Sequence, residues 1–281
     1  DGSNGSGGTF VSWCWKAGGS KNTFNVDDVG YATAAAAGLD SGTTNPTGAS
    51  VGTKQGFSII RYTGNNANRT IAHGLSQPPK FWIYKNLTDA TNWPVNYTIF
   101  GSMRYIYLNL DSAQGDNSGS YWGNMPTSDV LYIGADNDTN GDGDDHIIYA
   151  WHDVPGLQKF GTYEGIGGTA NGAFVELGFR PAIVWVKSID NGNANSHWCV
   201  FDNARPGYNK SPAQNRLHLD ENVVEDPDRV DDGQGIDILS NGFRVRSNNW
   251  YETNVTGETY LYCAWAEAPS INLYGGQSNA R

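Results

Sequence analysis

Short runs of hydrophobic residues, rich in aromatic and β-branched side chains, recur along the whole chain. They lie at residues 57–62, 80–85, 105–110, 130–134, 146–151, 182–187, 198–202, 236–239, 243–246 and 259–265. Gly, Asn, Asp and Ser separate them, and these residues form turns because they tolerate positive φ or bond to their own backbone. No window shows sustained helical periodicity. The pattern predicts an all-β chain built as antiparallel β-sandwiches of the jelly-roll type.

The order of these runs repeats once. The proline-led run Pro79–Lys85 is matched by Pro181–Lys187, and the closing run His146–Trp151 is matched by Tyr260–Trp265. Intervening motifs keep the same order in both copies. A duplicated unit sets domain boundaries without reference to other proteins.

The two copies differ in length between their strands. The offset grows from 101 residues, between Tyr62 and Tyr163, to 114 residues, between Trp151 and Trp265. Matching strands with loops of variable length are typical of a rigid sandwich that carries adaptable loops. We therefore predict two tandem β-sandwich domains from an internal repeat. The domains are 56–158 and 159–269.

Three further segments flank these repeats. Residues 7–16 resemble the closing run 257–265, so we expect residues 1–20 to be the closing strand of a preceding repeat or domain in a longer polypeptide. Residues 21–55 hold an alanine run and a Gly/Thr/Ser/Pro tract, which indicate an ordered connector. Residues 270–281 are expected to form a C-terminal tail.

Several motifs together resemble a known family. They are Trp13–Gly19, Gly30–Leu39, Pro46–Ser50, Gly56–Gly64, His73–Leu75, Lys159–Gly161, Gly178–Pro181 and Asn241–Phe243. As a set they look like a domain family common in marine and cyanobacterial phage virion proteins, usually tail-fibre, tail or capsid-associated proteins. The resemblance implies a location in the virion, with assembly in the host cytoplasm and exposure on the particle. It supplies no catalytic residues.

The net charge and the hydropathy of the chain argue against binding to nucleic acid and insertion into a membrane. The net charge is −11 with a pI near 4.7, so nucleic acid would repel the chain. There is no apolar stretch near 18 residues, and we expect no membrane insertion. Cys14, Cys199 and Cys263 show no CxxC spacing and lie in apolar runs, which predicts buried free thiols.

An acidic run at 136–145 has the spacing of a calcium loop. Oxygen side chains alternate, and Gly141 permits a sharp turn, so the run fits the first half of a Ca²⁺-binding loop. The candidate ligands are Asp136, Asp138, Asn140, Asp142 and Asp144. Because Ile147 stands where a bidentate Glu would close the loop, an acidic solvated hairpin loop is the alternative. The acidic stretch 220–232 has no such spacing and is interpreted as a solvated insertion.

Two aromatic pairs lie in polar segments. Tyr121 with Trp122, and Trp250 with Tyr251, are surrounded by Ser, Asn and Gly. Sugar rings stack on exposed indole faces, so these four residues are candidate ligand contacts, with packing at a subunit interface as the alternative. The tryptophans inside apolar runs are expected in the core. They are Trp151, Trp185 and Trp265.

No constellation for catalysis emerges. His152 and Asp153 are adjacent, but Ala266 and Glu267 replace them in the second copy. The other histidines are scattered and are interpreted as turn or sheet-surface residues. They are His73, His146, His197 and His218. No activated nucleophile or carboxylate pair stands out, so a non-enzyme is expected.

The sequence therefore predicts a structural virion protein, in a tail fibre or a capsid decoration. It would act as a spacer and bind other virion proteins or host-surface glycans. A homo-oligomer is expected because virions repeat chains by symmetry, and a trimer if the protein is a fibre. The alternatives are a secreted or cell-surface carbohydrate-binding module and, third, a polysaccharide depolymerase.

Overall fold

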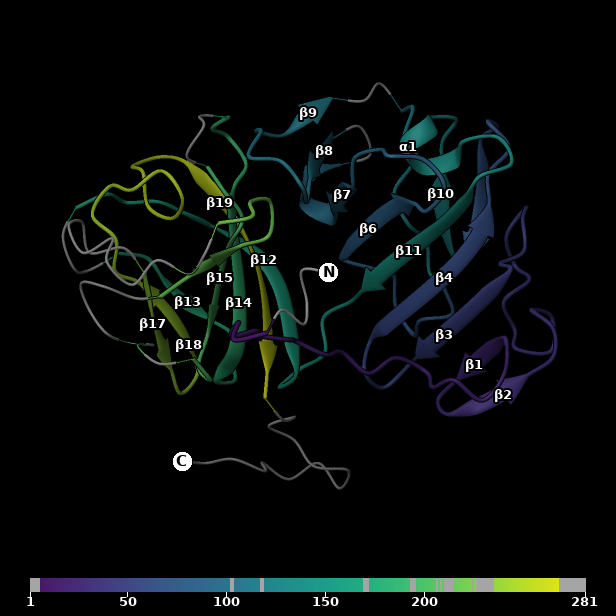
Figure 1. Cartoon of the computed structure of the whole chain (residues 1–281), viewed down its shortest axis with the longest axis horizontal. Coiled ribbons are helices and arrows are strands. Elements are labelled where there is room, and N and C mark those ends of the chain that lie inside the picture. Colours follow the sequence, from purple (N-terminus) through teal and green to yellow (C-terminus); the bar gives the residue numbers. More distant parts are fainter. Residues whose placement is uncertain are drawn as a thin grey trace.

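The computed structural model describes residues 6–101, 104–116, 119–168, 172–192, 196–205, 207, 209, 215–223, 225 and 235–267. Within these ranges the chain is all-β, which confirms the predicted fold class, and its sheets form two lobes (Figure 1). The helical elements in these ranges are a 3₁₀ turn, η1 (Thr98–Phe100), and a four-residue helix, α1 (Asn137–Asn140). None is long enough to cross a bilayer.

The first lobe is built on a nine-stranded sheet. Its order is β2 (Val29–Tyr31), β1 (Phe24–Val26), β3 (Gly48–Gly52), β4 (Phe57–Thr63), β11 (Asp145–Trp151), β6 (Phe81–Asn86), β7 (Pro94–Tyr97), β8 (Arg104–Tyr107) and β9 (Gly115–Asp116). A second sheet pairs β5 (Arg69–Ala72) with β10 (Val130–Ile133). All of these strand pairs are antiparallel except β1 with β3, which is parallel.

The second lobe has a five-stranded and a three-stranded sheet. The larger has the order β12 (Gln158–Glu164), β19 (Thr259–Ala266), β14 (Pro181–Ser188), β15 (Cys199–Asp202) and β16 (Leu217–His218). The smaller has the order β13 (Phe174–Glu176), β18 (Gly242–Val245) and β17 (Ile236–Leu239).

The large sheets of the two lobes share one strand order. β4-β11-β6-β7-β8 in the first lobe corresponds to β12-β19-β14-β15-β16 in the second, with the last strand along the chain lying beside the first in both. A tandem copy would produce this arrangement. The duplication itself stays a prediction.

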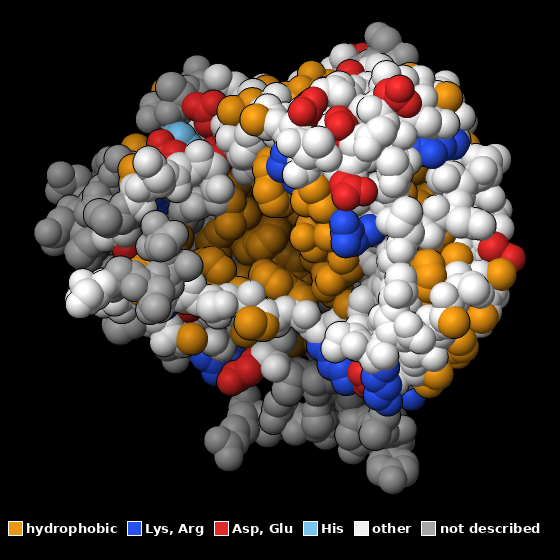
Figure 2. Space-filling model, turned by 45° about the vertical axis from the view of Figure 1, so that its right-hand side comes forward, with side chains coloured by type: hydrophobic (Ala, Val, Ile, Leu, Met, Phe, Trp, Pro, Cys, Tyr) orange, Lys and Arg blue, Asp and Glu red, His pale blue; other side chains and the backbone are white. Residues whose placement is uncertain are grey.

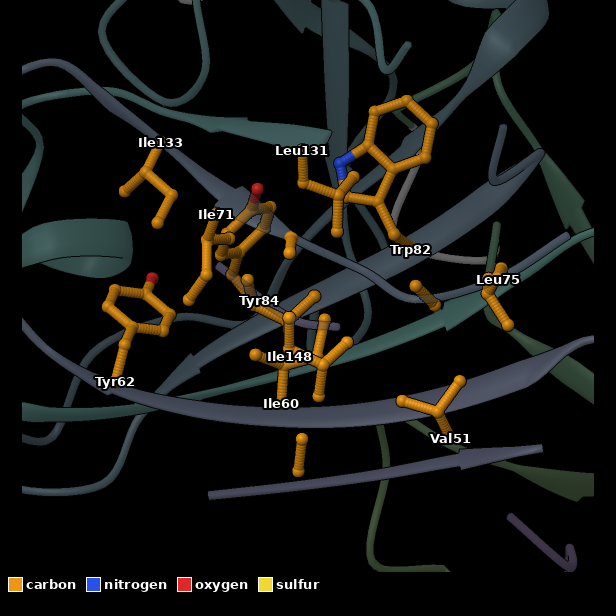
Figure 3. Packing of buried hydrophobic residues seen from close by; sticks show 14 of the residues in the cluster. Val51, Ile60, Tyr62, Ile71, Leu75, Trp82, Tyr84, Leu131, Ile133 and Ile148 are labelled. Carbon is orange, nitrogen blue, oxygen red and sulfur yellow. The ribbon is translucent and has the colours of Figure 1, made fainter. Parts of the chain in front are cut away.

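Both faces of each large sheet are apolar. Side chains alternate along a strand, so in β6 Trp82 and Tyr84 point to one face while Phe81 and Ile83 point to the other. The first face packs against β5 and β10, as Figure 3 shows for Tyr84, Ile71 and Leu131. The equivalent face of the second lobe packs in the same way against β13, β17 and β18.

The remaining faces of the two large sheets meet each other and form an interlobe core. Phe81 of β6 stacks on Phe160 of β12 with ring centroids 5.5 Å apart, and Trp151 of β11 meets Trp265 of β19 edge-on at 6.2 Å. Other members include Ile83, Val95, Tyr97, Ile106, Trp185, Trp198, Val200, Leu261 and Cys263. The expected core placement of Trp151, Trp185 and Trp265 is confirmed.

Hydrogen bonds also cross between the lobes. Trp198 Nε1 donates to Tyr107 O at 2.8 Å, and Lys187 Nζ donates to Asp111 O at 3.0 Å. Burial lowers the pKa of the Lys187 ammonium to about 8. These bonds, with the shared aromatic core, fix the orientation of one large sheet against the other.

The two large sheets do not close completely. Figure 2 shows a hollow between the lobes whose walls are hydrophobic. The interlobe core accordingly includes half-buried side chains that come from both lobes and from the N-terminal segment. They include Trp13, Trp15, Ile59, Trp93, Tyr149 and Ile183.

The segments before residue 56 differ from expectation. No strand forms in the described residues 6–20, and their assignment to a preceding repeat or domain stays a prediction. The predicted connector, residues 21–55, instead supplies β1, β2 and β3 to the first large sheet. Asp27 and Asp28 make this possible, since both take positive φ in the two-residue turn between β1 and β2. Because its strands are short and its turn residues are polar, such a hairpin gives no clear strand pattern in the sequence.

The cysteines are free thiols, but only two of the three are buried. Cys199 and Cys263 lie inside the second lobe, whereas Cys14 is exposed. Its expected burial is wrong because the segment around it lies outside any described sheet.

His73 is fully buried in the first lobe rather than on a surface. Its Nδ1 accepts the backbone N–H of Leu75 at 3.0 Å, and its Nε2 lies 3.2 Å from Thr127 O. This pair of bonds requires the neutral imidazole with a proton on Nε2. Burial lowers the pKa of His73 from 6.5 to about 4.

Acid should therefore destabilise the fold through His73. The unfolded chain binds a proton at this residue below pH 6.5, whereas the folded chain does so only near pH 4, so the free energy of unfolding falls as the pH falls between these values. The full effect is about 3 kcal/mol. Urea titrations at several pH values should show a shallower pH dependence in His73→Gln. An unchanged dependence would contradict the assignment.

Candidate functional site

The predicted calcium loop folds as the short helix α1. Asp136 caps it, because its Oδ1 accepts the backbone N–H of Asp138 at 2.9 Å. Asp138 Oδ2 in turn accepts the hydroxyl of Tyr121 at 3.1 Å. The oxygens that would face an ion thus hold the helix and the neighbouring loop.

Asn140 and Asp144 are also engaged within the protein. The Asn140 amide is buried and donates to Ala67 O and Gly134 O, both at 2.8 Å. Asp144 Oδ2 accepts from Asn86 Nδ2 at 2.8 Å. Among the described residues, the carboxylates of this run do not gather in a group of three ligand atoms within 4.8 Å. Calcium binding here stays a prediction.

Tyr121 and Trp122 are core residues of the first lobe, so their prediction as exposed ligand contacts is wrong. Trp122 is 2% exposed and stacks on Tyr84 with ring centroids 5.9 Å apart. Gly134 N–H donates to Tyr121 O at 2.7 Å, which ties the polar loop to the end of β10 and turns both rings inward. The Ser and Gly residues that flank Tyr121 and Trp122 do not indicate this hydrogen bond in the sequence.

The second predicted pair lies at the surface of the second lobe. Tyr251 is 42% exposed, and Trp250 is half-buried with its indole N–H donating to Glu252 Oε2 at 2.9 Å. Ligand binding by these two residues stays a prediction. Through Glu252, Trp250 is connected to a group of polar side chains in the second lobe.

We call these groups the second-lobe polar cluster. Its members are His197, Cys199, Arg216, His218, Asp220, Glu221, Trp250 and Glu252. The sheet register creates its centre, because Cys199 of β15 lies directly opposite His218 of β16. Side chains that face each other across two antiparallel strands are close enough to touch.

Glu252 is the centre of the inner half of the cluster. This side chain is 1% exposed, and its Oε2 lies 2.9 Å from Arg216 Nε and 3.3 Å from Cys199 Sγ. Its Oε1 lies 3.3 Å from His218 Nε2. A buried carboxylate is stable only when paired in this way, so Glu252 holds the turn at 250–254 against β15 and β16.

Glu221 and Asp220 hold the two imidazoles in the outer half. Glu221 lies 2.8 Å from His218 Nδ1 and 3.2 Å from His197 Nε2. Asp220 Oδ2 lies 3.0 Å from His197 Nδ1. The two rings stack with centroids 4.9 Å apart. Both histidines therefore have fixed orientations.

These contacts shift the ionisation of three groups. Burial would raise the pKa of Glu252, but the contacts with His218 and Arg216 outweigh it and lower the pKa to about 2. For His218, burial lowers the pKa, and the adjacent carboxylates of Glu252 and Glu221 more than offset this, so the pKa is raised. Burial, with the adjacent Glu252, raises the pKa of the Cys199 thiol.

Sequence reasoning missed this cluster. It interpreted His197 and His218 as scattered and assigned 220–232 to a solvated insertion, although Asp220 and Glu221 are the partners of those histidines. A weak signal existed in the alternation of Arg216, His218 and Asp220, which places polar groups on one face of an edge strand. Cys199 and Glu252 are too distant in sequence to be joined to them without the sheet register. The remaining members of 220–232 lie mostly outside the described residues.

The fold and this site define the class: an all-β protein of two lobes with a shared core and a buried polar cluster in the second lobe. The chain belongs to the family described as a domain of unknown function, DUF7483, which matches residues 1–269. No curated protein and no solved structure gives a significant match to the chain.

Proposed function

We propose that this chain is a structural component of a bacteriophage virion, in a tail fibre or a capsid decoration. Its lobes act as one rigid spacer, and its exposed surfaces bind other virion proteins or the host surface. The sequence motifs that resemble phage virion domains support the location. The joined lobes support the mechanical role, since a shared aromatic core resists bending between them.

The observation that carries the proposal is the hydrophobic hollow between the lobes (Figure 2). Large apolar surfaces are uncommon on isolated proteins in water and typically mark contacts with another protein. An assembly in which copies of this chain pack together would cover the hollow. This is the behaviour expected of a virion component that forms a homo-oligomer.

The N-terminal segment supports the same conclusion. Its sequence resembles the closing strand β19, yet residues 8–17 form no strand in the structure, and Phe10 and Val11 are 51% and 40% exposed. An exposed apolar segment that lies outside the described sheets favours pairing with another strand. A second chain in the assembly would supply that strand.

Two measurements test the assembly. Mass photometry of the purified chain should show a homo-oligomer, a trimer in the case of a fibre. Density from intact phage particles that encode the chain should contain both lobes at a repeated position. A chain that remains monomeric and is absent from purified particles would overturn the proposal.

A carbohydrate-binding module is the second candidate, and Trp250 and Tyr251 favour it. The exposed ring of Tyr251, next to the half-buried indole of Trp250, offers a stacking face to a sugar. If this surface binds host glycans, a glycan array should show binding that Tyr251→Ala reduces at least about tenfold. Phe174→Ala, which removes an equally exposed ring on β13, should leave it unchanged. Binding that survives Tyr251→Ala would exclude this surface.

A further inference from the structure

We propose that Cys199, His218 and Glu252 form a binding site for a divalent transition-metal ion, with Zn²⁺ the ion that fits them best. One ligand atom from each residue lies within 4.8 Å of the other two. A thiolate, an imidazole and a carboxylate are the ligands that Zn²⁺ takes in proteins, whereas Ca²⁺ prefers oxygen alone. This proposal is independent of the proposed function in the virion.

The spacing of the ligand atoms suits a tetrahedral ion. With Zn–S of about 2.3 Å and Zn–N or Zn–O of about 2.0–2.2 Å, the edges of a tetrahedron are about 3.3–3.6 Å. Cys199 Sγ lies 3.3 Å from Glu252 Oε2, and His218 Nε2 lies 3.3 Å from Glu252 Oε1. Three protein ligands leave one position for water. These two spacings involve different oxygens of Glu252, so the carboxylate must rotate to bring one oxygen to the ion, and Arg216 must leave the site.

His218 is already oriented as a metal ligand. Its Nδ1 is held by Glu221 Oε2 at 2.8 Å, which directs Nε2 toward Cys199 and Glu252. Histidines that ligate metals almost always donate their other ring N–H to a carboxylate or carbonyl group in this way. The sheet fixes the remaining geometry, since Cys199 and His218 are cross-strand partners.

The inner oxygen of Glu252 requires a positively charged group beside it. Glu252 Oε1 is fully buried without a hydrogen bond, although His218 Nε2 is 3.3 Å away. When the His218 proton is on Nδ1, both of these atoms are acceptors, and two facing lone pairs in a buried site repel each other. A proton on Nε2 or a metal ion relieves this repulsion.

Arg216 is the competitor of the metal. Its Nε lies 2.9 Å from Glu252 Oε2 and 3.2 Å from His218 Nε2, so the guanidinium neutralises the cluster in the metal-free chain. Metal binding requires this side chain to move away from Glu252. The ion displaces the proton of the Cys199 thiol, and the proton of His218 Nε2 wherever that imidazole is charged, and both are released to the buffer.

The test uses Co²⁺ as a spectroscopic probe on the full chain, freed of metal by a chelator. Co²⁺ should produce a thiolate-to-cobalt charge-transfer band and the visible bands of a four-coordinate ion, and Zn²⁺ should abolish both. A folded wild-type chain that gives no charge-transfer band would overturn the proposal without any variant.

Variants identify the ligands. Cys199→Ser should remove the charge-transfer band, and Glu221→Gln, which weakens the hold on His218 without removing a ligand, should weaken Zn²⁺ binding about 10- to 100-fold. Cys263→Ser is the matched control, because Cys263 is equally buried in the same lobe and lies outside the group. Circular dichroism should establish that each variant is folded. A band retained in Cys199→Ser but lost in Cys14→Ser would place the metal on the exposed thiol and overturn the site.

Arg216→Met separates a metal site from a purely structural ion pair. Removing the competing guanidinium should tighten Zn²⁺ binding at least about tenfold. Unchanged or weaker affinity in a folded Arg216→Met chain would show that the cluster is a structural ion pair and would overturn the metal site.

Discussion

Replacing Phe81 by Ala should lower the free energy of unfolding by about 3–5 kcal/mol, and both lobes should still unfold in one transition at the lower stability. Phe81 is fully buried between Trp151 of its own lobe and Phe160 of the other, with ring centroids 5.6 and 5.5 Å away. The cavity would lie in the interlobe core, where neither lobe can repack alone. Urea unfolding followed by tryptophan fluorescence and by circular dichroism measures both quantities.

Phe174→Ala is the control for Phe81→Ala. It removes the same ring from β13, where the side chain is 43% exposed, so the free energy of unfolding should change by no more than about 0.5 kcal/mol. Coincident transitions by both probes are expected for a cooperative unit. If wild-type chain unfolds in two steps and Phe81→Ala shifts only one, the lobes are independent and the shared core does not couple them.

Replacing Glu252 by Ala should lower the free energy of unfolding by nearly as much. In metal-free buffer the loss should be about 3–5 kcal/mol, because Arg216 is 8% exposed and would remain buried without its carboxylate. Thermal or urea unfolding measures it. The double variant Glu252→Ala with Arg216→Met should recover most of the loss, since no unpaired charge is left in the site.

The exposed carboxylate Glu164 at the end of β12 provides the control. Glu164→Ala should change the free energy of unfolding by no more than about 0.5 kcal/mol. A double variant as unstable as Glu252→Ala alone would show that Cys199, His218 and Trp250 depend on the carboxylate for more than charge balance. Arg216 would then not be the source of the cost.

Strand prediction succeeded where both faces of a strand are buried. The runs at 80–85, 146–151, 182–187 and 259–265 became β6, β11, β14 and β19, which are central strands of the large sheets. Such strands read as continuous apolar runs, and their signal is strong because each residue is buried on one face or the other. The hairpin of β1 and β2 was missed because its strands are short, partly exposed and joined by polar residues.

Site prediction succeeded less well, because it assumed that a residue with polar neighbours in the sequence is exposed to solvent. Trp122 stands in a polar loop and is nevertheless a core residue, since its loop is tied to β10 through Gly134. Trp250 and Tyr251 do lie toward the surface, but their environment depends on Glu252 and its partners from β15 and β16. The neighbours of a residue in the sequence do not indicate which distant strand lies beside that residue in the fold.

The sequence by itself determined that this protein is all-β and where its central strands lie, because side-chain alternation and turn residues act over a few positions. Only the tertiary structure decided that the two large sheets share a core, that residues 21–55 extend one of them, and that Cys199, His218 and Glu252 converge. These depend on strand register and sheet packing, which join residues far apart in the chain and leave little trace in any short segment.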